Sequence, residues 1–178
     1  MRRKPRSALL ACQALALTTI VVASGTASAQ ETAGCDQFAW PVVKERQLFA
    51  DPSLAAVSSG ASLAALPSGA IALALLPGDK VAFALAPGKV PKDPASMGGL
   101  IIISEKPKPG LYQVTISEPG WIDVIQNGQF VKAAQHSGRK DCTGVHKTVR
   151  FELTAEPVTI QFSGVGAASV NVAVLPVP

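Results

Sequence analysis

Residues 110–134, GLYQVTISEPGWIDVIQNGQFVKAA, contain the clearest strand pattern in the chain. Three runs rich in β-branched and aromatic residues fill this stretch, at 111–117, 121–126 and 129–133. Glu118-Pro119-Gly120 separates the first two runs, and Asn127-Gly128 separates the last two. An Asn-Gly pair between alternating apolar residues is the strongest local signal for a two-residue hairpin, because both turn residues adopt a positive φ. The stretch therefore predicts three consecutive antiparallel strands.

The chain beyond this stretch alternates apolar and polar residues with a period of two in three segments, 147–153, 157–163 and 169–175. In the first of them, Val149, Phe151 and Leu153 share one face. Arg150 and Glu152 share the other. This period, with one polar face, is typical of an antiparallel sheet that buries one side.

The chain upstream is divided by Pro67, Pro77 and Pro87, each with a glycine one or two residues later. Proline and glycine favour turns, so we expect strands between them and one more before residue 110, at 70–76, 80–86 and 100–104. Residues 90–99 are predicted to form a polar loop. A short helix is predicted over 42–50, and residues 53–66 have no assignable pattern.

These elements predict an all-β fold, an antiparallel jelly-roll-like β-sandwich of about eight or nine strands with one short N-terminal helix. We expect three parts in the chain. They are a secretory signal peptide (1–29), an N-terminal lead with the helix (30–65) and the β-sandwich domain (66–178).

The first 29 residues carry the features of a cleaved signal peptide. Four basic residues in MRRKPR precede an apolar run at 8–23, and Ala27-Ser28-Ala29 supplies small residues before the expected cleavage point. The run is short for a membrane span of about 20 residues. We therefore expect a periplasmic or secreted protein with no membrane span after cleavage.

The net charge of the mature protein argues against nucleic-acid binding. The chain has 16 Lys and Arg and 12 Asp and Glu, but four of the basic residues lie in the signal peptide. Removing that segment leaves 12 residues of each sign, and a balanced chain lacks the basic surface that binds phosphate backbones.

Two cysteines, Cys35 and Cys142, remain once Cys12 leaves with the signal peptide. In an oxidising compartment the simplest expectation is one disulfide between them. The alternative is a pair of free, buried thiols.

The two histidines of the mature chain, His136 and His146, border a polar loop. With Asp141 or Glu152 they would supply the two histidines and one carboxylate that hold non-heme Fe²⁺. The alternative is a solvated loop with ordinary surface histidines, because the spacing matches no compact metal motif.

A second candidate site lies on the polar sheet face. If Ile122 and Val124 point inward, Trp121 and Asp123 point outward. Together with Arg150 they could form a carbohydrate platform, with the indole face against the sugar C–H groups and polar side chains around it. The alternatives are a merely solvated face, or the opposite alternation, which would place Trp121 in the core.

Three segments of the chain resemble a group of small secreted proteins from alphaproteobacteria. They are GCDQFAWPVVKER (34–46), GLYQVTISEPGWIDVIQNG (110–128) and DCTGVHKTVRFEL (141–153), and the resemblance spans most of the mature chain. Some members carry the name homogentisate 1,2-dioxygenase, so the resemblance implies that activity. The enzyme of that name is a longer, cytosolic cupin-type protein with iron on two histidines and a glutamate. No ligand carries over, because His136 and His146 form no H-x-H cluster.

The sequence lacks a G-x-S-x-G nucleophile motif and a glycine-rich phosphate loop. We therefore expect a non-catalytic periplasmic binding or interaction module without a cofactor, whose ligand the sequence does not identify. Carbohydrate and envelope proteins are the partner classes considered. One alternative is a non-heme iron dioxygenase-like enzyme with Fe²⁺ on His136 and His146, and another is a structural partner in a cell-envelope complex.

Overall fold

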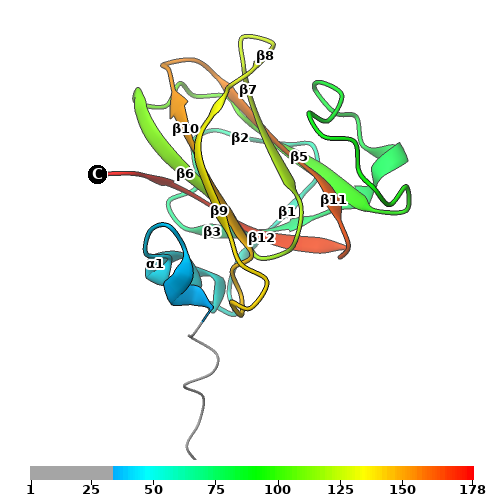
Figure 1. The fold of residues 1–178 in the computed structure, drawn as a ribbon. Helices are drawn as coiled ribbons and strands as arrows, with labels where there is room; N and C mark the ends of the chain where they lie inside the picture. Colours follow the sequence, from blue (N-terminus) through cyan, green and yellow to red (C-terminus); the bar gives the residue numbers. More distant parts are fainter. Residues whose placement is uncertain (1–33) are drawn as a thin grey trace, which may run out of the picture.

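The computed structural model describes residues 34–178 (Figure 1). The predicted signal peptide, residues 1–29, lies outside the described residues. The described part has two 3-10 turns, η1 (Cys35–Gln37) and η2 (Gly78–Lys80), and one α-helix, α1 (Val43–Phe49). Its twelve strands are β1 (Ala55–Ser58), β2 (Ala61–Leu63), β3 (Ala70–Ala74), β4 (Leu76–Pro77), β5 (Met97–Ile103), β6 (Gly110–Ile116), β7 (Trp121–Gln126), β8 (Gln129–Phe130), β9 (Ala133–Gly138), β10 (Lys147–Leu153), β11 (Val158–Val165) and β12 (Ser169–Pro176).

The strands form two six-stranded sheets. Sheet A has the order β1-β3-β12-β6-β10-β9. Sheet B has the order β2-β5-β11-β7-β8, with β4 also paired to β5. Ten of the twelve strands have at least one antiparallel neighbour. The other two have parallel neighbours, since β1 runs parallel to β3 and β2 runs parallel to β5. The prediction of a mainly β protein is confirmed. The prediction of purely antiparallel sheets with eight or nine strands is wrong.

The parallel pairs come from residues 53–66, for which the sequence predicted nothing. This Ala- and Ser-rich segment forms β1 and β2. Its small side chains produce little contrast between a buried and an exposed face, so no alternation marks the strands. Their pairing depends on distant backbone in β3 and β5.

One hydrophobic core lies between the sheets, and it follows the predicted alternation. Val149, Phe151 and Leu153 of β10 are buried in it, whereas Glu152 is exposed. From sheet B, Ile160 and Phe162 of β11 enter the same core fully buried. Burying a Phe or Ile side chain stabilises a fold by about 1.5–3 kcal/mol, so this shared core holds the two layers together.

The predicted Asn-Gly hairpin is present. Asn127 and Gly128 have φ values of 52° and 70°, as a type I′ turn requires, and they join β7 to β8. The predicted strand at 129–133 does not continue in one sheet, however. The chain leaves sheet B after Phe130 and pairs with β10 as β9, which extends into the polar loop expected between His136 and His146.

The predicted strand at 80–86 is wrong. After η2 the chain runs without regular strands to β5, and we call residues 81–96 the cover segment. It lies over the outer face of sheet B, where Gln161 Nε2 donates to the carbonyl oxygen of Leu85 at 3.0 Å. Proline lacks the N–H that a strand ladder needs, and Pro87, Pro91 and Pro94 lie within the segment. The expected loop at 90–99 also ends early, because β5 begins at Met97.

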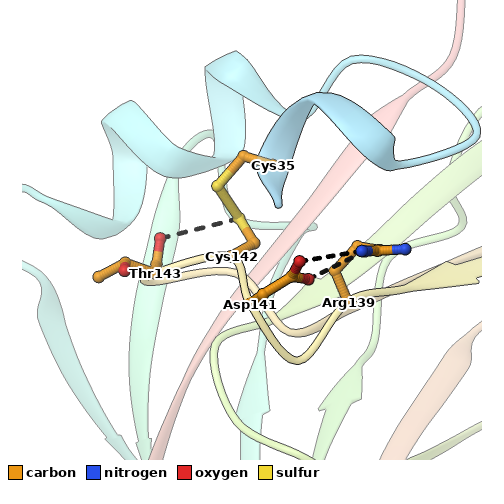
Figure 2. Close-up of a disulfide and its surroundings, with 5 residues drawn as sticks. All are labelled: Cys35, Arg139, Asp141, Cys142 and Thr143. Atoms are coloured by element: carbon orange, nitrogen blue, oxygen red, sulfur yellow. Dashed lines mark hydrogen bonds and ion pairs between the residues drawn. A yellow bond between two sulfur atoms is a disulfide. The ribbon is translucent and has the colours of Figure 1, made fainter. Parts of the chain in front are cut away.

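Residues 34–50, which we call the N-terminal segment, cover sheet A on the side of the molecule opposite the cover segment (Figure 1). The helix predicted at 42–50 is confirmed as α1, with Val42 and Phe49 buried in a second hydrophobic cluster. The predicted disulfide joins Cys35 to Cys142 with an S–S distance of 2.09 Å (Figure 2). It fastens η1 to the loop between β9 and β10.

Candidate functional site

Trp121, the first residue of β7, lines a hollow at the surface of the protein. Ile122 and Val124 lie in the core, so Trp121 and Asp123 point to the outer face of sheet B. On the neighbouring strand, Ser163 pairs with Trp121 and Gln161 pairs with Asp123. Side chains of directly paired residues share a face, so these four form one patch on that face.

A hydrogen-bond network centred on Asp123 fixes the orientation of the indole. Trp121 Nε1 donates to Asp123 Oδ1 at 2.8 Å, while the other carboxylate oxygen accepts from the backbone N–H of Gly88 at 2.9 Å. Gln161 Nε2 lies 3.4 Å from the same oxygen. Asp123 is only 8% exposed, so it acts as an internal anchor that joins β7, β11 and the cover segment.

Two lysine ammonium groups lie over the indole ring. The Nζ atom of Lys147, from β10, is 4.3 Å from the ring centroid, and that of Lys89, from the cover segment, is 5.2 Å away. Both distances are within the range of a cation–π interaction. Lys147 also donates to the carbonyl oxygen of Gly120 at 3.2 Å. Two cations from different parts of the chain therefore meet on one aromatic ring.

The charges of Lys147 and Lys89 favour binding of an anion between them. Burial lowers the pKa of Lys147 below its ordinary value, the charge of Lys89 lowers it further, and Asp123 opposes the shift. Desolvation and a like charge both disfavour the protonated ammonium. A negatively charged group placed between the lysines would offset both effects, because it stabilises the protonated ammonium groups.

These side chains border an open hollow of about 300 Å³, which we call the indole groove. Its lining consists of Lys89, Val90, Pro91, Lys92, Asp93, Ser96, Gly120, Trp121, Lys147, Ser163 and Gly164. Asp93, the acidic residue of the lining, accepts a hydrogen bond from the backbone N–H of Ala95. The Asp93 carboxylate therefore already forms a hydrogen bond within its own turn.

Ser163 supplies a second sign of a ligand site. The residue is 3% exposed, and its hydroxyl has no hydrogen-bond partner among the described residues. A buried polar atom without a partner is costly and rare in folded proteins. Ser163 lines the indole groove, and a ligand with hydroxyl or carboxylate groups could satisfy its hydroxyl if it displaces the atoms that cover that hydroxyl.

A second hollow of about 350 Å³ adjoins the indole groove, because Gly120 and Lys147 line both. We call it the histidine hollow, and its other lining residues are His136, Ser137, Gly138, Arg139, Lys140 and His146. Burial lowers the pKa of His146 below its ordinary value. The charges of Lys147 and Lys140 act in the same direction, and Glu118 opposes them.

The four residues proposed from the sequence as metal ligands do not assemble into a site. His136 and His146 line the same hollow, but Asp141 forms two hydrogen bonds to the Arg139 guanidinium, at 2.9 and 3.0 Å (Figure 2). Glu152 lies exposed farther along β10, opposite Leu111. Within residues 34–178, no three His, Cys, Asp or Glu side chains are grouped to hold a metal ion.

The three residues proposed as a carbohydrate platform are divided between the sheets. Trp121 and Asp123 belong to sheet B, whereas Arg150 belongs to sheet A. The Arg150 guanidinium lies 4.0 Å from the centroid of the Trp40 ring and donates to Gln113 Oε1 and Gln135 Oε1, at 3.1 Å each. Arg150 therefore helps to hold the N-terminal segment on sheet A, and it takes no part in the indole groove.

Sequence reasoning missed the lysines around Trp121. Lys89 and Lys92 belong to a short charged run, KVPKD, in a chain with only 16% charged residues. This run is the sequence feature that could have pointed to Lys89 and Lys92. No sequence feature pointed to Lys147, because it is separated from Trp121 by 26 positions and approaches it only through the packing of β10 near β7.

No protein family, curated protein or solved structure matches the chain. The functional argument therefore starts from the geometry of the site. In the part of the chain that the structure describes, no helix has the length and apolar character to cross a membrane.

Proposed function

We propose that the protein is an exported, non-catalytic binding module whose indole groove binds acidic carbohydrate. The observation that carries this proposal is the meeting of Lys89 and Lys147 over the ring of Trp121. The part of the indole that the lysines leave uncovered packs against the C–H groups of a sugar ring, and the two ammonium groups pair with a carboxylate on the same sugar. A uronic acid combines these two features in one unit.

The buried hydroxyl of Ser163 supports a sugar over a simple inorganic anion. A small ion between the lysines would leave most of a groove of about 300 Å³ unfilled. A sugar has several hydroxyl groups that donate and accept hydrogen bonds, so it can pair with the ammonium groups and, where it displaces the atoms that cover Ser163, with that hydroxyl as well. Binding sites with few polar groups on an apolar floor take their specificity from such placement.

The groove is built before any ligand arrives. Asp123 fixes the indole through Nε1, and the Gly88 N–H holds the cover segment against the same carboxylate. A preformed site loses less conformational entropy on binding. The disulfide is compatible with the proposed export to an oxidising compartment.

The proposed fold type is a jelly roll, and the strand order supports it. When β3, β5, β6, β7, β8, β10, β11 and β12 are lettered B to I in chain order, the sheets read B-I-D-G and C-H-E-F. This order is that of two interleaved Greek keys. Lectin domains use the same architecture, but the functional proposal depends on the groove, because one fold supports many functions.

The test is a binding titration with a galacturonic acid dimer and the matching neutral galactose dimer. The chain has two tryptophans, so a Trp40→Phe background leaves Trp121 as the reporter of fluorescence. We expect saturable quenching by the acidic dimer, with an affinity at least tenfold above that for the neutral dimer. Added salt should weaken the binding, because it screens the lysine charges.

Two variants and a control locate the binding. Lys147→Gln should lower the affinity about tenfold, and Lys89→Gln should lower it to a smaller extent. Lys132→Gln replaces an exposed lysine that lines neither hollow, and it should leave the affinity unchanged. Absence of binding, equal affinity for both dimers, or unchanged affinity in Lys147→Gln with circular dichroism like that of the parent protein would each refute the proposal.

A further inference from the structure

We propose that the ligand is a chain of acidic sugars that runs through both hollows, with Lys147 at the midpoint. This inference rests on the proposed function of the indole groove and specifies the length of its ligand. Gly120 and Lys147 line both hollows, so the two spaces adjoin. An extended ligand that passes Lys147 from the Trp121 side would enter the histidine hollow.

The charges around the histidine hollow suit a second acidic unit. Lys140 is exposed on its rim, and Lys147 forms the boundary with the indole groove. Asp141 would oppose an anion nearby, but its carboxylate is paired with the Arg139 guanidinium at 2.9 Å. Glu118 is the other acidic group that acts on this hollow, through its charge on His146. Because Arg139 is paired with Asp141, Lys140 is the further basic side chain that the histidine hollow adds, and its charge opposes that of Glu118.

The histidine hollow is held in place by contacts on two sides. β9 pairs with β10 from Gly138 to Ala133, and the backbone N–H of Ala39 donates to Ser137 Oγ at 3.0 Å. The disulfide fixes the following loop through Cys142. A side chain at Gly34 would collide with the backbone of Asp141, so η1 packs tightly against this loop. A rigid second hollow adds affinity for a longer ligand without a large ordering cost.

The dimensions agree with a ligand longer than one unit. The hollows measure about 300 and 350 Å³, and each is at the small end of the usual range for a ligand pocket of about 300–1,000 Å³. A site that extends across both falls well inside that range. Linking units that bind in adjacent hollows raises affinity, because the second contact becomes intramolecular.

The experiment compares galacturonic acid oligomers of one to six units by calorimetry on the mature protein. We expect the affinity to rise at least tenfold between short oligomers and those that reach both hollows, and then to level off. A Lys140→Gln, His136→Gln double variant should remove this rise and keep the affinity for the shortest binding oligomer. Lys132→Gln is the matched control and should retain the whole length dependence.

The outcomes separate this inference from the proposed function. If oligomers of every length bind with equal affinity, or if the double variant keeps the full rise, the extended site is wrong and the indole groove alone binds the ligand. If no oligomer binds at any length, the proposed function fails and the extended site fails with it. Circular dichroism of each variant must match that of the parent protein, so that loss of binding is assigned to the side chain.

Discussion

Removal of the Cys35–Cys142 disulfide should lower the stability of the fold by several kcal/mol. The perturbation is a Cys35→Ala, Cys142→Ala double variant. Alanine is preferred to serine because both cysteines are buried, at 4% and 7% exposure, in the second hydrophobic cluster. A hydroxyl in that apolar cluster would add a separate desolvation cost.

The magnitude follows from the length of chain that the disulfide closes. The two cysteines are separated by 107 residues, and the chain-entropy model gives about 4.8 kcal/mol at 25 °C for such a loop. Small domains are stable by about 5–15 kcal/mol, so the loss is a large share of the total. With a urea m-value of about 2 kcal/mol/M, the unfolding midpoint should fall by about 2.4 M.

The assay is equilibrium unfolding in urea, followed by circular dichroism, on the oxidised parent protein, the reduced parent protein and the double variant. The reduced protein and the double variant should unfold at similar midpoints. Limited digestion with trypsin gives a local readout. Lys44 and Arg46 should be cleaved faster without the disulfide, because the N-terminal segment is then held by packing and hydrogen bonds alone.

The result that refutes this reasoning is a change of less than about 1 kcal/mol in both disulfide-free proteins. It would mean that the reduced, unfolded chain is already as restricted as the cross-linked one, or that the bond is not formed in the native protein. Mass spectrometry of the oxidised parent protein distinguishes the two cases, because a formed disulfide lowers the mass by two hydrogens.

Three further predictions concern the core, the histidine hollow and the N-terminal segment. Phe162→Ala should cost about 3–5 kcal/mol in urea unfolding, because the side chain is fully buried between the sheets; the exposed Phe130→Ala is the control and should cost little. Because the pKa of His146 in the folded protein is lowered, the unfolded state takes up the proton first. The free energy of unfolding should therefore fall as the pH drops below about 6.5, the usual histidine pKa. His146→Gln should flatten this part of the pH profile. A profile identical to that of the parent protein would contradict the assignment of this pH dependence to His146. Glu45→Ala should cost about 1–3 kcal/mol by thermal unfolding, since the buried carboxylate accepts a 2.6 Å hydrogen bond from Gln113 Nε2; Lys44→Ala, an exposed neighbour, should leave the unfolding temperature unchanged.

Part of the candidate site was accessible from the sequence. The alternation in β7 placed Trp121 and Asp123 together on one face, and the structure joins them by a hydrogen bond. The same pattern wrongly suggested that Arg150 lies on one surface with Trp121 and Asp123. Alternation along a strand identifies its two faces, but it does not assign the strand to a sheet, and Arg150 lies on the other layer.

The sequence by itself determined the features that depend on neighbouring residues. The Asn127-Gly128 turn, the buried alternation of β10 and the limits of α1 follow from backbone preferences and from the burial of one face. The disulfide was also predictable, since Cys35 and Cys142 are the two cysteines that lie outside the predicted signal peptide.

Only the tertiary structure decided the parallel pairing of β1 and β2, the move of β9 into sheet A, and the approach of Lys89 and Lys147 to Trp121. Each of these features joins segments that are distant in the chain. Their free energy comes from packing and hydrogen bonds that form when the two layers close. Local propensity therefore does not encode them, and the groove on which the proposed function depends exists only in the folded molecule.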